Sequence, residues 1–174
     1  LTLQRGEFVA LMGSNGSGKS TLLETIMGFH LIKSGHCKIL NQDHHTYKTS
    51  QRVREVGYIF QNPDHQLFTQ SVWEEATLTS KNLGIPEKKY QTLAEEWLTL
   101  LKLDDRAEDH PQRLSYGEKR RLNLAATILH QPKLLLIDEL LIGQDMANAH
   151  TWMSFLSDYV NRGHSVFLVI HHAE

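Results

Sequence analysis

The sequence predicts an α/β domain in which helices cover both faces of a parallel β-sheet and a helical subdomain is inserted into the chain. Unbroken apolar runs, typical of strands buried on both faces, alternate with stretches that have helical periodicity. The middle of the chain, from about 69 to 113, carries helical signals alone. We expect a single domain over 1–174, with a core formed by 1–68 and 126–174 and a helical subdomain over 69–125.

The first part of the chain contains strand and helix signals in alternation. The apolar run 8–12 predicts a buried strand, and a loop rich in Gly, Ser and Asn follows it. A helix is expected over about 19–27, because Gly28 then ends the pattern. Shorter apolar runs at 36–40 and 57–60 predict two further strands.

The middle of the chain predicts at least two helices. Ser71 and Glu74 fit the capping-box pattern that opens a helix, and Pro86 stands where a second helix would begin. The apolar residues that recur at helical spacing after it are Tyr90, Leu93, Trp97 and Leu101. We expect Trp73 and Trp97 to lie in the core of this helical subdomain.

The last part returns to alternating helices and strands. An apolar stripe over 122–129 predicts a helix that Pro132 ends. The unbroken apolar runs 134–137 and 166–170 predict buried strands. A helix between these strands is predicted by the spacing of Trp152, Phe155, Leu156 and Tyr159.

Composition limits the class of partner. Lys and Arg total 18 and Asp and Glu total 20, a net charge of −2, so no nucleic-acid partner is expected. A single cysteine, Cys37, suits a reducing compartment. No apolar run reaches the roughly 20 residues of a membrane-spanning helix, so membrane association would need a partner. Because the chain lacks an initiating methionine, we expect the N- and C-terminal parts of the domain to lie outside it.

Residues 13–20 read Gly-Ser-Asn-Gly-Ser-Gly-Lys-Ser and match the phosphate-loop pattern at every fixed position. Glycines let the backbone curl so that N–H groups point at phosphate oxygens, and the following helix adds the positive end of its dipole. Lys19 would contact the β- and γ-phosphates, and Ser20 would be a ligand of Mg²⁺. The residues expected to bind ATP here are Gly13, Ser14, Asn15, Gly16, Ser17, Gly18, Lys19, Ser20 and Thr21. The strand before the loop and the helix after it favour a P-loop NTPase (RecA-like) fold over a flexible turn.

Two acids, Asp138 and Glu139, directly follow the buried run 134–137. In open parallel sheets, ligands bind at the carboxyl ends of the strands, so both side chains should lie near the phosphate loop. Adjacent strand residues point in different directions, which favours two roles. We expect Asp138 to hold Mg²⁺ and Glu139 to act as general base toward the attacking water. The alternative, two solvent-exposed acids at a strand end, is disfavoured by the phosphate loop.

The segment 114–118, Leu-Ser-Tyr-Gly-Glu, with Lys-Arg-Arg after it, resembles the signature of ABC transporter ATP-binding domains, usually Leu-Ser-Gly-Gly-Gln. Gln61 looks like the Q-loop of that family, 143–145 like its D-loop and His171 like its switch histidine. The resemblance covers essentially the whole chain in the family's order. Residues 60–68, Phe-Gln-Asn-Pro-Asp-His-Gln-Leu-Phe, are similar to the Q-loop of energy-coupling factor importers, which take up vitamins and cobalt or nickel ions.

The resemblance implies an ATP-hydrolysing importer subunit that acts as a dimer with an identical or paralogous ATPase domain. Each ATP would lie between the phosphate loop of one domain and the signature segment of the other. The implied contacts across the dimer are Ser115, Gly117 and Glu118. The implied catalytic residues are Glu139, His171 and Gln61, and the implied Mg²⁺ ligands are Ser20, Gln61 and Asp138. The helical subdomain would dock on an integral-membrane transport subunit at the cytoplasmic face of the cell membrane.

The sequence departs from the family pattern in the signature, where Tyr116 stands in place of a glycine. This side chain would crowd the opposite nucleotide unless it points outward. Taken alone, Ser115 is equally explained as a helix cap. Other departures stand at Leu140, Leu141, Gln144 and His172.

Three alternatives to an importer ATPase remain at this point. A soluble ABC protein acting on ribosomes or DNA is disfavoured by the near-neutral charge, and the short separation of Lys19 from Asp138 excludes members with a long coiled coil. A nucleotide-binding regulator with weak turnover is favoured by Tyr116 and disfavoured by Glu139. A P-loop kinase would not need the signature segment.

The sequence also contains 11 histidines, which raises the question of a metal site. There is neither a Cys pair nor a His-Glu-x-x-His helix. We therefore expect solvent-exposed histidines at the four clustered positions, which are His30, His36, His44 and His45.

Overall fold

The structure is a computed structural model that describes residues 1–139 and 146–171, apart from the side chains of 146–151 and of 171. These residues form two compact units. The first, here called the sheet unit, consists of Leu1–Tyr58 and the described parts of Lys133–Ile142 and Met146–Glu174. The second, the helical unit, is Ile59–Pro132. The subdomain bounds predicted from the sequence stay a prediction.

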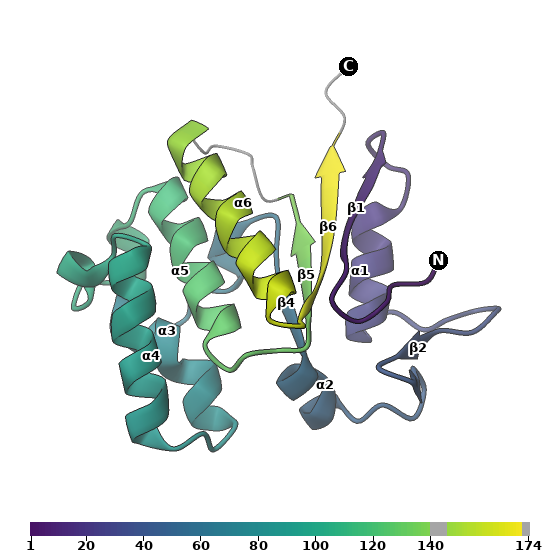
Figure 1. Cartoon of the computed structure of the whole chain (residues 1–174), viewed down its shortest axis with the longest axis horizontal. Helices are drawn as coiled ribbons and strands as arrows, with labels where there is room; N and C mark the ends of the chain where they lie inside the picture. Colours follow the sequence, from purple (N-terminus) through teal and green to yellow (C-terminus); the bar gives the residue numbers. More distant parts are fainter. Residues whose placement is uncertain (140–145, 172–174) are drawn as a thin grey trace. The chain divides into compact units, whose positions relative to one another are not determined.

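A four-stranded sheet in the order β1-β6-β5-β4 forms the core of the sheet unit (Figure 1). Its strands are β1 (Phe8–Gly13), β4 (Val56–Ile59), β5 (Leu134–Asp138) and β6 (Ser165–His171). The pairs β1–β6 and β5–β6 are parallel. All positions of β4 and β5 are buried, as their unbroken apolar sequences predict. The predicted parallel sheet is confirmed.

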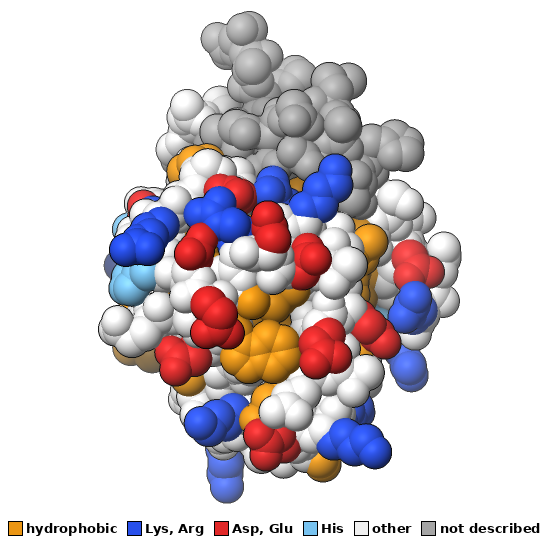
Figure 2. All heavy atoms as spheres, turned by 90° about the vertical axis from the view of Figure 1, so that its left-hand side faces the viewer, with side chains coloured by type: hydrophobic (Ala, Val, Ile, Leu, Met, Phe, Trp, Pro, Cys, Tyr) orange, Lys and Arg blue, Asp and Glu red, His pale blue; other side chains and the backbone are white. Residues whose placement is uncertain are grey.

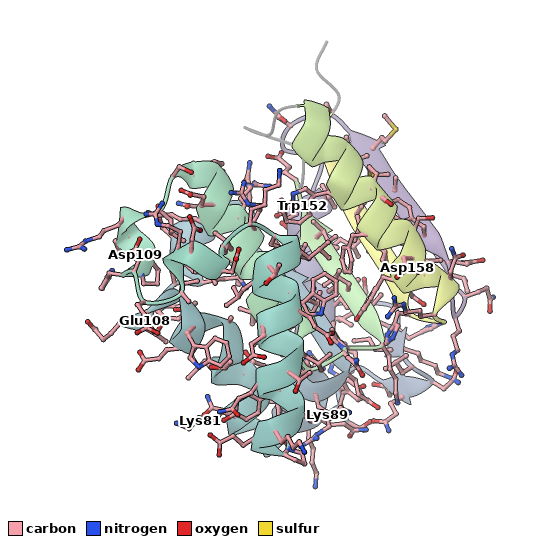
Figure 3. All side chains as sticks on the ribbon, turned by 60° about the vertical axis from the view of Figure 1, so that its left-hand side comes forward. Lys81, Lys89, Glu108, Asp109, Trp152 and Asp158 are labelled. Atoms are coloured by element: carbon pink, nitrogen blue, oxygen red, sulfur yellow. The ribbon has the colours of Figure 1, made fainter. Side chains whose placement is uncertain are left out.

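Two helices cover this sheet. Helix α1 (Lys19–Met27) packs on β5, and α6 (Met146–Asn161) packs on β6. Figure 1 shows α6 on the nearer side of the strands and the fainter α1 on the farther side. In Figure 3, Trp152 points toward the interior and Asp158 points outward. Trp152 is 2% exposed, so the predicted apolar face of this helix is buried.

The segment between α1 and β4 differs from the sequence prediction. The strand predicted at 36–40 is present as the shorter β2 (Lys38–Ile39). It pairs antiparallel with β3 (Gln42–Asp43), which was not predicted. Leu40 and Asn41 connect the two strands with positive φ angles of 49° and 67°, as tight hairpin turns require.

Helix α2 (Thr49–Glu55) also lies in this segment and was not predicted. Its sequence is polar and has no apolar stripe, but Arg52 is buried and anchors it. The Arg52 guanidinium donates to the His44 carbonyl at 2.9 Å. A His44 ring nitrogen lies 2.5 Å from the Thr25 carbonyl, and His44 is only 5% exposed. The expectation that His44 is solvent-exposed is therefore wrong.

The helical unit is built from α3 (Val72–Asn82), α4 (Glu87–Leu100) and α5 (Tyr116–Ile128), which pack against one another. The 3₁₀ turns η1 (Pro63–His65), η2 (Asp104–Arg106) and η3 (Pro111–Arg113) connect them. Among the described residues, no helix is long and apolar enough to cross a membrane.

Ser71 caps α3 as predicted, because its hydroxyl accepts the Glu74 N–H at 3.1 Å. The Glu74 carboxylate accepts from the Gln70 N–H at 3.2 Å, one residue before the position a reciprocal capping box would use.

The buried face of α4 differs from the predicted one. Its buried residues are Tyr90, Ala94 and Leu98, and Leu101 directly after the helix is buried as well. Leu93 and Trp97 are half-buried, and so is Trp73 of α3, so these tryptophans lie at the edge of the core. The buried residues Tyr90, Ala94 and Leu98 form an i, i+4 ridge along the helix. The sequence prediction relied on large apolar residues and therefore overlooked the small Ala94.

Candidate nucleotide-binding site

The loop between β1 and α1 has the geometry of a phosphate loop. Gly16 and Gly18 adopt positive φ angles of 76° and 86°, which a side chain would strain. Gly18 is the N-cap of α1 and supplies no side-chain cap, so the N–H groups of the first turn are not capped by that residue. The start of this helix therefore offers donors and a positive dipole end to an anion.

Lys19 carries the charge of this loop. It is 6% exposed, and its ammonium donates to the carbonyls of Gly13 at 2.7 Å and Ser14 at 2.8 Å. These two carbonyls thus fix the Lys19 ammonium next to the main chain of the loop. The loop residues around it are exposed, namely Ser14, Asn15, Gly16, Ser17 and Gly18. A buried cation beside an exposed loop rich in glycine and serine fits a polyphosphate.

Asp138 ends β5 and is 4% exposed. Its Oδ1 is buried and has no hydrogen-bond partner among the described residues. The Tyr58 hydroxyl is hydrogen-bonded to the Asp138 carboxylate; burial and the charge of this carboxylate raise the pKa of Tyr58. A buried carboxylate oxygen without a protein donor fits a hard cation such as Mg²⁺, for which oxygen is the preferred ligand.

Glu139 follows with an unusual backbone. Its φ is 56°, in the left-handed region that few non-glycine residues adopt. Its N–H donates to the Val169 carbonyl at 3.2 Å, and the residue is 3% exposed. Non-glycine residues in this region cluster at functional sites, where the surrounding structure enforces the conformation. The hydrogen bond to β6 holds the Glu139 main chain in this conformation.

The sheet register gathers the carboxyl ends of three strands. Asp138 of β5 and Leu11 of β1 both pair with Val169 of β6. Two residues further, Gly13 pairs with His171, so the backbone of His171 lies beside the start of the phosphate loop. The D-loop candidate, 143–145, falls outside the described residues, as do Leu140, Leu141 and His172.

The signature segment lies in the helical unit and forms a complete capping box. The Ser115 hydroxyl accepts from the Glu118 N–H at 3.3 Å, and the Glu118 carboxylate accepts from the Ser115 N–H at 2.7 Å. The Ser115 hydroxyl and N–H, with Arg106 at 3.2 Å, lower the pKa of Glu118. In this structure Ser115 therefore serves as a helix cap, the alternative role expected for it from the sequence. Gly117 lies in the first turn of α5 and is half-buried.

Gln61 also belongs to the helical unit, where it follows β4. Its carbonyl accepts hydrogen bonds from Tyr116 and Arg120 of α5. Tyr116 has helical backbone at the first position of α5, and its hydroxyl reaches the Gln61 loop. The tyrosine is thus accommodated without the positive φ that a glycine permits.

The predicted site residues therefore fall into two groups. The phosphate loop, Asp138, Glu139 and the backbone of His171 lie in the sheet unit, at the carboxyl ends of its strands. The helical unit carries Gln61, Ser115, Gly117 and Glu118. Sequence reasoning missed Tyr58, because nothing in the apolar run around it marks its contact with Asp138. It noted Arg120 only as part of a basic run.

Comparison with known proteins agrees with this geometry. The family model described as ABC transporter matches residues 1–141. A putative ABC transporter ATP-binding protein of Methanosarcina acetivorans is 38% identical over 100% of this chain and 28% of its own length. The putative HMP/thiamine import ATP-binding protein YkoD of Bacillus subtilis is 35% identical over 99% of this chain and 31% of its own length. This chain thus spans less than a third of these curated relatives.

Solved structures share the fold. CbiO1 from Clostridium perfringens, part of the ABC transporter complex CbiONQ, superposes with a TM-score of 0.83 at 26% identity, over 99% of this chain and 70% of that chain. A dimeric ATP-binding cassette in a post-hydrolysis state with ADP and phosphate gives a TM-score of 0.89 at 25% identity, over 99% and 78%. The chain belongs to the ABC transporter family, as an ATP-binding domain with the P-loop fold.

Proposed function

We propose that this chain binds ATP with Mg²⁺, hydrolyses it, and drives an ABC importer of the energy-coupling factor type. The observation that carries the proposal is the arrangement of Lys19, Asp138 and Glu139 in the sheet unit. All three are less than 10% exposed, and they belong to the phosphate loop and to the strand end where ligands of parallel sheets bind.

Each residue of this arrangement has a proposed role. The loop amides and Lys19 hold the β- and γ-phosphates, which is the main source of affinity. Ser20 and Asp138, with Gln61, would hold Mg²⁺, which when bound neutralises charge on the phosphates. Glu139 accepts a proton from the attacking water.

His171 is proposed to hydrogen-bond the γ-phosphate. Support comes from the register, which sets its backbone beside Gly13. Because phosphoryl transfer depends mainly on positioning and on charge stabilisation, these donors and acids are the proposed contribution of the sheet unit to hydrolysis.

The second half of the site is proposed to come from another domain of the same kind. Ser115, Gly117 and Glu118 would contact the nucleotide held by the opposite phosphate loop. Support comes from the exposure of Ser115 at the N-terminus of α5, where a helix dipole favours an anion. A dimeric ATP-binding cassette with ADP and phosphate is among the structural neighbours.

An importer role is supported by the name of one relative, and a transporter role by the description of one structural neighbour. YkoD is described as an HMP/thiamine import protein, and CbiO1 as part of CbiONQ. We propose that the helical unit docks on an integral-membrane subunit at the cytoplasmic face of the membrane. Figure 2 shows an apolar centre ringed by acidic side chains on the side that carries α3 and α4. The exposed acids of this unit are Asp64, Glu74, Glu87, Glu95, Glu96, Asp104, Asp105 and Glu108.

In the helical unit, Figure 3 shows Glu108 and Asp109 well apart from Lys81 and Lys89. An acidic, partly apolar face would favour a partner segment that carries basic and apolar side chains.

A nucleotide-binding regulator with weak turnover is the second candidate. Its support is the Ser115 hydroxyl, which also donates to Glu118 at 2.7 Å and so is engaged within its own helix cap. If this bond persists when nucleotide binds, the signature half would contribute little to hydrolysis.

The test compares Glu139→Gln with the matched control Glu96→Gln in the full-length protein. Glu96 is an exposed glutamate of α4, so the same chemical change there should leave turnover unchanged. We expect Glu139→Gln to bind ATP normally, to lose at least about 100-fold in kcat, and to accumulate as an ATP-bound dimer in gel filtration. Unchanged turnover would remove Glu139 as base. A wild-type protein that binds ATP without Mg²⁺-dependent turnover would favour the regulator.

A further inference from the structure

One face of helix α5 holds the Gln61 segment. Arg120 donates to the Gln61 carbonyl at 2.6 Å, and the Tyr116 hydroxyl donates to the same carbonyl at 3.3 Å. One turn further along α5, the Asn123 amide donates to the Pro63 carbonyl at 3.0 Å. The main chain of this segment is therefore bound to the helix that begins at the signature.

Tyr116 and Arg120 also contact each other. They are four residues apart, which puts them on one side of the helix. The Arg120 guanidinium lies over the Tyr116 ring, 5.5 Å from its centroid, and one of its nitrogens lies 3.5 Å from the Tyr116 hydroxyl. Arg120 is 1% exposed, whereas Tyr116 is 43% exposed. The ring thus covers a buried cation and keeps it aimed at the carbonyl.

A charged donor and a hydroxyl on one carbonyl oxygen are a strong restraint. Hydrogen bonds from an ionised donor are about twice as strong as neutral ones, and burial of Arg120 increases the cost of leaving it without its acceptor. The main chain at Gln61 consequently has little freedom to move apart from α5. A glycine at 116 would supply neither the hydroxyl nor the ring.

We propose that Tyr116 and Arg120, here called the Gln61 clamp, are positioning residues that fix the main chain of Gln61 and through it the response of the site to Mg²⁺. This inference rests on the proposed function, in which Gln61 contacts Mg²⁺ and the attacking water. The clamp joins Gln61 to the first turn of the signature helix, so a displacement of that turn is passed to Gln61. In this proposal, Tyr116 has a positioning role toward Gln61 of its own chain.

The test compares Tyr116→Phe with Tyr90→Phe in the full-length protein. Tyr116→Phe removes the hydroxyl but keeps the ring over Arg120, and Tyr90 is a buried tyrosine of α4 in the same unit. In the absence of nucleotide, we expect Tyr116→Phe to speed amide hydrogen exchange in residues 60–66 and to leave α3 and α4 unchanged. Tyr90→Phe should not alter exchange in 60–66.

The kinetic arm measures ATP hydrolysis at varied Mg²⁺. Tyr116→Phe should lower kcat about five-fold, the rate equivalent of one net hydrogen bond, and raise the Mg²⁺ concentration for half-maximal rate. KM for ATP should stay unchanged, because the phosphate loop is untouched. Tyr116→Gly, which removes the ring as well, should show a larger effect in the same direction.

Two results would overturn the inference. The first is that both Tyr116 variants match wild type in two measurements, amide hydrogen exchange in residues 60–66 and the Mg²⁺ dependence of ATP hydrolysis. The other is higher turnover in Tyr116→Gly, which would mean that the tyrosine obstructs the site. Failure of the proposed function is distinguishable, because it would leave the wild-type protein itself without Mg²⁺-dependent hydrolysis.

Discussion

The two units carry their site residues in different ways. In the sheet unit, Lys19, Asp138 and Glu139 are buried and held by backbone contacts, and a phosphate loop surrounds the lysine. In the helical unit, Ser115 and Tyr116 are exposed at the start of α5. A buried, preorganised half binds ligand by itself, whereas an exposed helix end needs a second surface to exclude water. The difference agrees with the proposed site shared between two copies of the domain, in which the sheet unit would supply most of the nucleotide affinity.

The largest effect is expected from Asp138→Asn. Its buried oxygen without a donor is the proposed Mg²⁺ ligand, and the amide would weaken that contact while preserving size. We expect kcat to fall on the order of 100-fold while nucleotide binding without Mg²⁺ is retained. The exposed Asp104→Asn serves as control. Equal activity of the two variants would show that Asp138 does not hold the metal.

A stability effect is expected at Gly28, which ends α1. Its φ is 86°, and a Cβ there would lie 1.8 Å from a nitrogen of the buried Arg52 guanidinium. We expect Gly28→Ala to lower the free energy of unfolding by about 2 kcal/mol or more, because strain and crowding add. Gly35→Ala is the control, since Gly35 has a similar φ of 83° and no atom within 4 Å of a Cβ. Urea unfolding of both variants measures the difference, and equal losses would contradict the anchoring role of Arg52.

A smaller effect is expected from Tyr58→Phe. The hydroxyl of this buried tyrosine is hydrogen-bonded to Asp138, so its loss loosens the carboxylate. We expect about a five-fold decrease in kcat and a loss of about 1 kcal/mol in stability. Tyr47→Phe removes a comparable bond to Glu55 and should cost stability without altering kcat. If both variants keep full turnover, Tyr58 does not position Asp138.

The smallest effect concerns the capping box of the signature helix. The pKa of Glu118 is lowered mainly by the Ser115 hydroxyl, so the ionised form stabilises the folded state. That contribution is present above the ordinary pKa of a glutamate and is lost as pH falls through the lowered value. Glu118→Gln should therefore reduce stability at pH 7 by less than about 1 kcal/mol and match wild type in strong acid. Urea unfolding across pH measures this, and a pH-independent difference would contradict it.

Much of the fold could be predicted because its strands and main helices bury apolar side chains. The runs 134–137 and 166–170 predicted β5 and β6 within about one residue, since nothing polar interrupts them. Helix α2 could not be predicted, because a buried arginine, which bonds to residues earlier in the chain, holds it in place. His44 was misjudged for the same reason: its burial depends on Arg52 and Thr25 and not on a local pattern.

The candidate site was predictable where its chemistry follows from spacing. Glycines and a lysine at fixed spacing indicate the phosphate loop, and the end of an apolar strand run indicates the acids at 138 and 139. No such signal identifies the proposed positioning residues. In the sequence, Tyr58 is one more residue of an apolar strand, and Tyr116 is a departure from a family pattern. Only the structure relates them to Asp138 and to the Gln61 carbonyl.

In the proposed function, the phosphate loop of the sheet unit binds ATP through the charge of Lys19. The most direct test is equilibrium binding of ATP to Lys19→Ala, with the exposed Lys33→Ala as matched control. We predict that Lys19→Ala weakens binding on the order of 100-fold and abolishes hydrolysis, while Lys33→Ala matches wild type. Wild-type affinity and turnover in a folded Lys19→Ala protein would contradict the account.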